Sequence, residues 1–246
     1  MPARHLYFIM TNTWNRLALL IFAVLSLLVA GELRAGVVVG GTRFIFPADR
    51  ESISILLTNT SQESWLINSK INRPTRWAGG GEASTVPAPL LAAPPLILLK
   101  PGTTGTLRLL RTESDILPVD RETLFELSIA SVPSGKVENQ SVKVAMRSVF
   151  KLFWRPEGLP GDPLEAYQQL RWTRNSQGVQ LTNPTPYYIN LIQLSVNGKA
   201  LSNAGVVPPK SQRQTSWCQA IAPCHVAWRA INDYGGLSAK KEQNLP

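Results

Sequence analysis

The sequence has few of the residues on which most enzyme active sites depend. Its 246 residues include two histidines and two cysteines. A Ser-His-Asp or Cys-His site in the body of the chain would have to be built on His225, because His5 stands near the N-terminus. There is no HExxH motif and no glycine-rich phosphate-binding loop, and the spacing of the sixteen acidic residues favours no catalytic pair. We therefore predict a protein that is not an enzyme and needs no cofactor.

Long apolar runs are also scarce, and the one that stands out lies near the N-terminus. Residues 18–30 are thirteen apolar or small residues, preceded by Arg4 and Arg16 and followed by Leu33-Arg34-Ala35. A basic start, a short apolar stretch and a small-residue end are typical of a secretory signal peptide. The run is short for an uncleaved membrane anchor, the other interpretation. We therefore predict that residues 1–35 are a cleaved signal peptide.

Acidic residues are outnumbered by basic ones, 16 to 25, which gives a formal net charge of +9. The charged residues of the predicted leader sum to +2, so the exported chain carries +7. A basic surface suits nucleic acid, an anionic surface or acidic partners. Export argues against nucleic acid, and the basic residues are scattered, with no run longer than Lys240-Lys241. We therefore expect no nucleic acid among the partners.

The two cysteines, Cys218 and Cys224, are separated by five residues. In an oxidising compartment such a pair normally forms a disulfide. Closing so small a loop stabilises the fold by about 2 kcal/mol on a chain-entropy model. The adjacent His225 leaves a metal site as the alternative, but only three ligands are evident and a structural zinc site needs four. We predict a disulfide and no metal.

Short strand-like segments make up most of the exported chain, since β-branched, aromatic and alternating apolar residues recur between turn residues such as Lys100-Pro101-Gly102. Asn197-Gly198 is a strong hairpin signal. Residues 79–95, rich in Gly, Ala and Pro, favour a long loop or an irregular edge and indicate no function. The pattern predicts an all-β fold of antiparallel sandwiches. The predicted strands are residues 37–46, 52–58, 65–71, 106–110, 124–132, 142–153, 170–174, 179–182, 187–196 and 226–231.

A domain boundary is predicted where turn-forming residues interrupt this pattern. Residues 155–161, with the sequence RPEGLPG, contain two prolines and two glycines, which end a strand and favour a linker. The segments before and after it are each long enough for one small domain. We therefore predict domains at 36–156 and 157–246.

Several stretches form a specific pattern by their order and spacing over residues 36–236: Gly41-Thr42-Arg43, Pro95-Leu96, Leu99-Lys100-Pro101-Gly102, residues 120–125, residues 151–156, residues 183–188 and residues 231–236. Together they resemble the periplasmic chaperones of the chaperone–usher pilus pathway. The resemblance implies two immunoglobulin-like β-sandwich domains with an inter-domain cleft, a location in the periplasm, binding of pilus subunits (pilins), and their delivery to an outer-membrane usher. It also implies a possible self-capping dimer when the protein is free. An exported immunoglobulin-like adhesion or structural module is the alternative.

Residues 142–147 have an alternating pattern that places Val142, Val144 and Met146 on one face of a strand. On the pattern alone, this is an ordinary half-buried strand that packs on its own core. The resemblance implies instead a strand donated to a subunit whose open groove would otherwise aggregate. Three such side chains contribute about 5–8 kcal/mol before ordering costs.

The resemblance assigns two further sets of residues. Arg43 and Lys151 match the two basic positions that anchor the C-terminal carboxylate of the subunit, a role suited to charge-assisted hydrogen bonds. Strict alternation puts Lys151 on the face opposite Val144; a bulge or bend between them would reconcile the two roles, but the sequence does not show one. Glu122, Arg155 and Asp233 match an ion-pair network between the domains. The short connection over residues 133–141 and the absence of cysteine from the first domain resemble the short-loop branch of the family.

Overall fold

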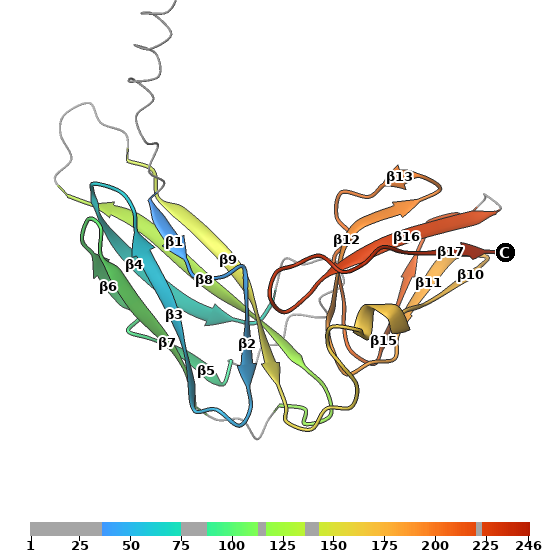
Figure 1. Ribbon diagram of the computed structural model, residues 1–246, viewed down its shortest axis with the longest axis horizontal. Helices are drawn as coiled ribbons and strands as arrows, with labels where there is room; N and C mark the ends of the chain where they lie inside the picture. The colour runs from blue at the N-terminus through green and yellow to red at the C-terminus, as the bar shows by residue number, and fades with distance from the viewer. Residues whose placement is uncertain (1–35, 75–87, 113–116, 136–142, 220–222) are drawn as a thin grey trace, which may run out of the picture. The chain divides into compact units, whose positions relative to one another are not determined.

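The computed structural model describes residues 36–74, 88–112, 117–135, 143–219 and 223–246 (Figure 1). Val142 and the predicted signal peptide therefore lie outside the described residues. Within the described part there is no α-helix, a single 3₁₀ turn stands at η1 (Ala166–Gln169), and no helix is long and apolar enough to cross a membrane. The predicted all-β class is confirmed.

The first nine strands form a sandwich of two sheets. All neighbouring strands are antiparallel except β2 and β9, which run parallel. The four-stranded sheet has the order β1 (Val37–Val39), β3 (Ser52–Asn59), β7 (Thr104–Arg111), β5 (Leu90–Ala93). The five-stranded sheet has the order β2 (Arg43–Pro47), β9 (Met146–Arg155), β8 (Thr123–Ser134), β4 (Ser64–Asn72), β6 (Leu96–Leu99).

Alternating apolar residues hold these two sheets together. Leu57 and Leu107 from one sheet and Phe125 from the other are completely buried in the shared core. Phe46 stacks on Trp154, with 5.4 Å between ring centroids, and so ties β2 to β9. Each such side chain contributes about 1.5–3 kcal/mol by leaving water. The core therefore fixes the position of β9, on which the candidate site depends.

The remaining strands form a second, smaller sandwich. Trp172 and Trp228 lie 5.0 Å apart between ring centroids in its buried core. One sheet has the order β10 (Arg171–Asn175), β11 (Gly178–Asn183), β15 (Ser211–Thr215). The other has the order β13 (Lys199–Ala200), β12 (Ile189–Val196), β16 (Cys224–Ile231), β17 (Lys241–Leu245), with β14 (Val206–Val207) also paired to β12.

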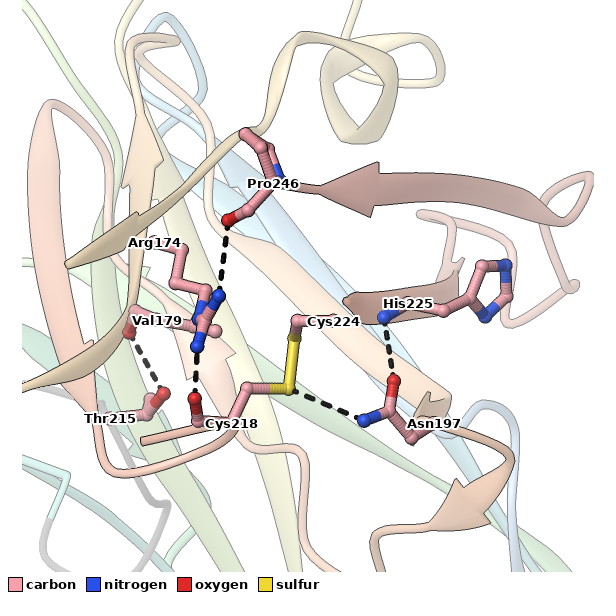
Figure 2. The surroundings of a disulfide bond; sticks show 8 residues. All are labelled: Arg174, Val179, Asn197, Thr215, Cys218, Cys224, His225 and Pro246. Carbon is pink, nitrogen blue, oxygen red and sulfur yellow. Dashed lines mark hydrogen bonds between the residues drawn. A yellow bond between two sulfur atoms is a disulfide. The ribbon is translucent and has the colours of Figure 1, made fainter. Parts of the chain in front are cut away.

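The predicted hairpin and the predicted disulfide are both confirmed in this second sandwich. Asn197 and Gly198 have φ angles of 48° and 77°, and they join Val196 to Lys199 across a two-residue turn. Cys218 and Cys224 are bonded through their sulfurs, with 5.9 Å between their Cα atoms (Figure 2).

Contacts beside the disulfide join Cys218 and His225 to neighbouring parts of the second sandwich. The side-chain nitrogen of Asn197 lies 3.9 Å from the sulfur of Cys218, and its side-chain oxygen accepts a 2.7 Å hydrogen bond from the backbone N–H of His225 (Figure 2). Arg174 on β10 donates to the carbonyl of Cys218 at 3.3 Å. The predicted metal alternative is set aside, because both thiols are used in the disulfide.

Several predicted strands were drawn wrongly. The segment 37–46 is two strands in different sheets, because the chain turns at Gly40 and Gly41, with the N–H of Gly41 donating to the carbonyl of Val39. Strand β5 lies inside the segment 79–95 that was predicted as a loop or irregular edge, and β6 follows it directly. Strands β15 and β17 were missed because their sequences, SQRQT and KEQNL, are polar.

Candidate functional site

The two basic residues singled out from the sequence are direct neighbours in the five-stranded sheet. Arg43 opens β2, and it stands opposite Lys151 in the parallel β2–β9 ladder. Side chains at the same level of adjacent strands project from the same face. The fold therefore brings two cations, which are 108 positions apart in the sequence, onto one patch of surface.

The guanidinium of Arg43 is only partly hydrogen-bonded to described residues. Its Nη1 donates a 2.7 Å hydrogen bond to the carbonyl of Ile231, at the end of β16. Its Nε is buried, and no described residue accepts a hydrogen bond from it. Burial lowers the pKa of Arg43, while the charges of Asp233 and Glu122 act in the opposite direction. A buried donor without a partner costs about 1–3 kcal/mol, so this edge of the guanidinium is suited to an anionic acceptor.

Lys151 lies between two charged neighbours in the sheet. Arg43 stands on one side of it, and Glu126 on β8 stands directly opposite on the other. Burial, and secondarily the charge of Arg43, lower the pKa of Lys151 to about 8. Glu126 is 4% exposed and was missed in the sequence, although its position in a strand of buried apolar residues was a signal for it. The ammonium group therefore remains mostly charged at neutral pH but has lost part of its hydration.

The N-terminal half of β9 is an open sheet edge. Within the described chain, residues 146–150 pair with β8 alone, because β2 meets β9 only over residues 151–155. Met146, the first residue of β9, is 58% exposed, and Val144, two residues before the strand, is 63% exposed, whereas Leu152 of β9 is completely buried. The start of the strand and the residue before it thus present apolar side chains beyond the end of the core.

No bulge interrupts the part of β9 that pairs with β8. The ladder runs in unbroken register from Met146, opposite Ser131, to Trp154, opposite Thr123. Lys151 therefore projects from the sheet face opposite to that of Met146, as strict alternation requires. A partner strand that lies along the edge of β9 can reach both faces, so the two predicted roles do not require a bulge.

The three residues predicted to form an ion-pair network lie in contact. Arg155, the last residue of β9, donates to Oε1 of Glu122 from Nε at 2.7 Å. It also donates to both carboxylate oxygens of Asp233, at 2.7 and 3.0 Å. The second oxygen of Glu122 accepts from the N–H of Tyr188 at 2.7 Å. Both oxygens of Glu122 are thus satisfied, and Arg155 joins a loop before β8 to the loop after β16.

Electrostatics in this cluster follow from burial. Burial raises the pKa of Glu122 to about 7, against the opposing pull of Arg155 and of the Tyr188 N–H. Burial also disfavours the charge of Arg155, but its hydrogen bonds to Asp233 and the charge of Glu122 outweigh this and raise its pKa. The guanidinium therefore stays charged throughout, and the raised pKa brings the carboxyl of Glu122 to titrate near neutral pH.

Further contacts in the same region were missed in the sequence. Lys210 forms a 2.7 Å ion pair with Asp120, which was named only as part of a motif. A Cβ atom at Gly235 would lie 2.9 Å from Oγ1 of Thr42, and Gly235 has a φ of 82°, so a larger residue is excluded there on two grounds. Leu124 and Phe153 of the first sandwich form a buried cluster with Val206 of the second. Sequence distance hid these pairs, since no local pattern connects their members.

Comparison with known protein families matches both sandwiches. Residues 36–160 match the N-terminal PapD domain of pili and flagellar-assembly chaperones, and residues 165–242 match the C-terminal domain of the PapD pili assembly chaperone. The chain therefore belongs to the family of pili assembly chaperones. This is a periplasmic family whose role in folding and assembly is not enzymatic, and the adhesion-module alternative is set aside.

Individual relatives agree with this assignment. The chain is 98% identical over 237 residues to the fimbrial chaperone YcbF of Escherichia coli (strain K12), covering 96% of this chain and 100% of that one. It is 33% identical over 224 residues to the chaperone protein FimC of the same strain, covering 89% of each. The solved structure of the Salmonella enterica SafA pilin in complex with the SafB chaperone matches with a TM-score of 0.72 and 30% identity, over 88% of this chain and 99% of that one.

Proposed function

We propose that this chaperone holds a pilus subunit by adding its strand β9 to an incomplete subunit sheet. The open edge over residues 146–150 of the described chain carries this proposal, because unpaired backbone groups at an edge are a template for another strand. Val144 and Met146 supply apolar side chains for the groove of the subunit, and we include Val142 as a third. Burying the exposed parts of Val144 and Met146 contributes about 2–3 kcal/mol before ordering costs.

Arg43 and Lys151 are proposed to anchor the C-terminal carboxylate of the subunit. The support is their adjacency in the β2–β9 ladder and the buried Nε of Arg43, which lacks an acceptor among the described residues. A carboxylate there accepts charge-assisted hydrogen bonds and offsets the repulsion between two neighbouring cations. Anchoring the end of the chain also sets the register of the subunit strand along β9.

The other parts of the proposal concern organisation and partners. We propose that residues 1–35 direct export and are removed, leaving domains at 36–156 and 157–246. The cluster of Glu122, Arg155 and Asp233 then fixes one domain on the other through short contacts. The loaded chaperone delivers its subunit to an outer-membrane usher, and in the absence of a subunit two copies cap each other's open edge, which would otherwise favour aggregation.

Co-expression with candidate pilins in a bacterial periplasm tests the proposal. We expect wild type to co-purify with a pilin in a one-to-one complex. Arg43→Ala, Lys151→Ala and Val144→Glu should each lose most of the bound pilin, the last because a carboxylate cannot enter an apolar groove without a large desolvation cost. Leu56→Glu is the matched control, since Leu56 is 55% exposed on β3 and should leave pilin retention unchanged.

The outcomes separate the parts of the proposal, provided that circular dichroism shows every variant to be folded. If folded variants retain pilins as well as wild type does, the assigned strand and anchor are wrong. If wild type retains no pilin from any operon of the same genome, subunit holding itself is contradicted.

A further inference from the structure

A hollow of about 230 Å³ opens beside Lys151. One wall comes from β12, and another comes from the segment 201–205 between β13 and β14. Its lining combines apolar side chains with uncharged polar ones, and among the described residues Lys151 is the only ionisable one in the lining. Residues on its walls include Lys151, Asn190, Gln193, Leu201, Ala204 and Ile231.

The wall formed by β12 is distorted where it faces the hollow. The pairing of β12 with β16 shifts register between Ile192 and Ser195, which is a β-bulge. Gln193 in this bulge is exposed and has a φ of 49°, a left-handed conformation that is strained for a residue other than glycine. Bulges of this kind re-aim side chains beside functional sites. The strained residue is thus placed at the rim of the hollow.

Asn190 provides an unsatisfied acceptor on the same wall. Its side chain is 5% exposed, and its Oδ1 has no hydrogen-bond donor among the described residues. Asn190 stands opposite Ile231 in the β12–β16 ladder, and the carbonyl of Ile231 accepts the hydrogen bond from Arg43. The unused oxygen therefore lies close to the two cations proposed to hold the carboxylate of a subunit.

We infer that this hollow receives the side chain of the last residue of the bound subunit, and that Asn190 and Gln193 select a neutral side chain with an apolar stem and a hydrogen-bond donor, such as glutamine. The inference rests on the proposed anchoring of the terminal carboxylate, because Lys151 lines the hollow and that carboxylate would place the terminal residue at its mouth. The apolar walls accept the stem, and the oxygen of Asn190 accepts the donor. A basic terminal side chain is excluded by repulsion from Arg43 and Lys151.

Peptide binding to the purified mature chaperone tests this selection. The probes are fluorescein-labelled peptides that copy the C-terminal strand of a co-purified pilin, with a free carboxylate and a last residue of Gln, Leu or Lys. On wild type, we expect the Gln peptide to bind at least about fivefold tighter than the Leu peptide, since an unpaired buried acceptor is left in the complex with Leu. The Lys peptide should bind most weakly.

Two variants test the named residues. Asn190→Leu, which is close in volume, should reduce the preference for Gln over Leu to within about twofold. Gln193→Gly removes the side chain and the left-handed strain, so the Gln peptide should bind more weakly while the thermal midpoint stays the same or rises. Gln212→Ala, at an exposed glutamine on β15, is the control that should change neither quantity.

The failures of this inference and of the proposed function are distinguishable. Equal binding of all three peptides to wild type, lost in Arg43→Ala, would overturn the selectivity and leave the anchoring intact. A preference for Gln that persists unchanged in Asn190→Leu would also overturn the role given to this hollow. Absence of binding by every peptide would contradict the anchoring and this inference together.

Discussion

The lowered pKa of Lys151 predicts that the chaperone loses affinity for its subunit as the pH rises above neutrality. Burial and the charge of Arg43 bring this pKa to about 8 in the free protein. A carboxylate bound beside Lys151 stabilises the ammonium and raises its pKa again. At a pH above 8, binding must therefore take up a proton, and the affinity falls with increasing pH.

The size of this effect follows from the two protonation states. With a pKa of about 8, roughly nine-tenths of the free protein carries a charged Lys151 at pH 7, but only about one-tenth does so at pH 9. If the bound form keeps the ordinary lysine pKa of about 10.4 or higher, the lysine stays charged in the complex throughout this range. The dissociation constant should then increase about tenfold between pH 7 and pH 9.

Fluorescence anisotropy with a peptide copying the C-terminal strand of a pilin measures this dependence. Lys151→Arg is the control, because a guanidinium stays charged across the whole range and its complex should vary by less than about twofold. Any other group that titrates, including those of the peptide, affects both proteins equally. Equal pH dependence in wild type and Lys151→Arg would refute the assignment of Lys151 to the anchor.

Three further predictions concern stability. Arg155→Ala should lower the free energy of unfolding, measured in urea, by about 3–5 kcal/mol, because it leaves the buried carboxylate of Glu122 without its partner. Asp120→Asn should cause no measurable loss, because the ion pair of Asp120 with Lys210 is exposed. Replacing both Cys218 and Cys224 by alanine should lower the free energy of unfolding by about 2 kcal/mol, which is measured as a lower melting temperature. The pKa of Glu122 is raised to about 7 in the folded state, so the folded protein keeps this proton up to a higher pH than the unfolded chain does. Relative to Glu122→Gln, the free energy of unfolding of wild type should therefore fall as the pH rises from about 4.5 to 7. A rise over this range would contradict the assignment.

The fold class could be predicted because strand patterns are local. The alternation around Leu57 and Leu127 and the turn at Asn197 and Gly198 are readable within a few residues. The break at Gly40 was missed, because apolar residues continue on both sides of it and only tertiary pairing reveals that they enter different sheets. Polar edge strands such as β15 have no apolar period from which they could be predicted.

The candidate site was accessible from sequence only through family resemblance. Nothing local indicates that Arg43 will stand beside Lys151, or that Arg155 will reach Asp233, because these contacts arise from sheet order and from loops distant in the sequence. The roles given to these residues remain predictions, while their contacts are features of the fold. No sequence pattern predicts the hollow beside Lys151, because one of its walls contains the bulge at Gln193, which no local pattern indicates.

Amide hydrogen exchange of β9 tests the central claim most directly. In the free protein, the backbone amides at the open edge over residues 146–150 should exchange quickly, because in the described chain only β8 pairs with this part of the strand. Addition of a pilin should protect these amides strongly while leaving those of the distant edge strand β5 unchanged. Formation of a stable one-to-one complex without protection of residues 146–150 would contradict donation of this strand.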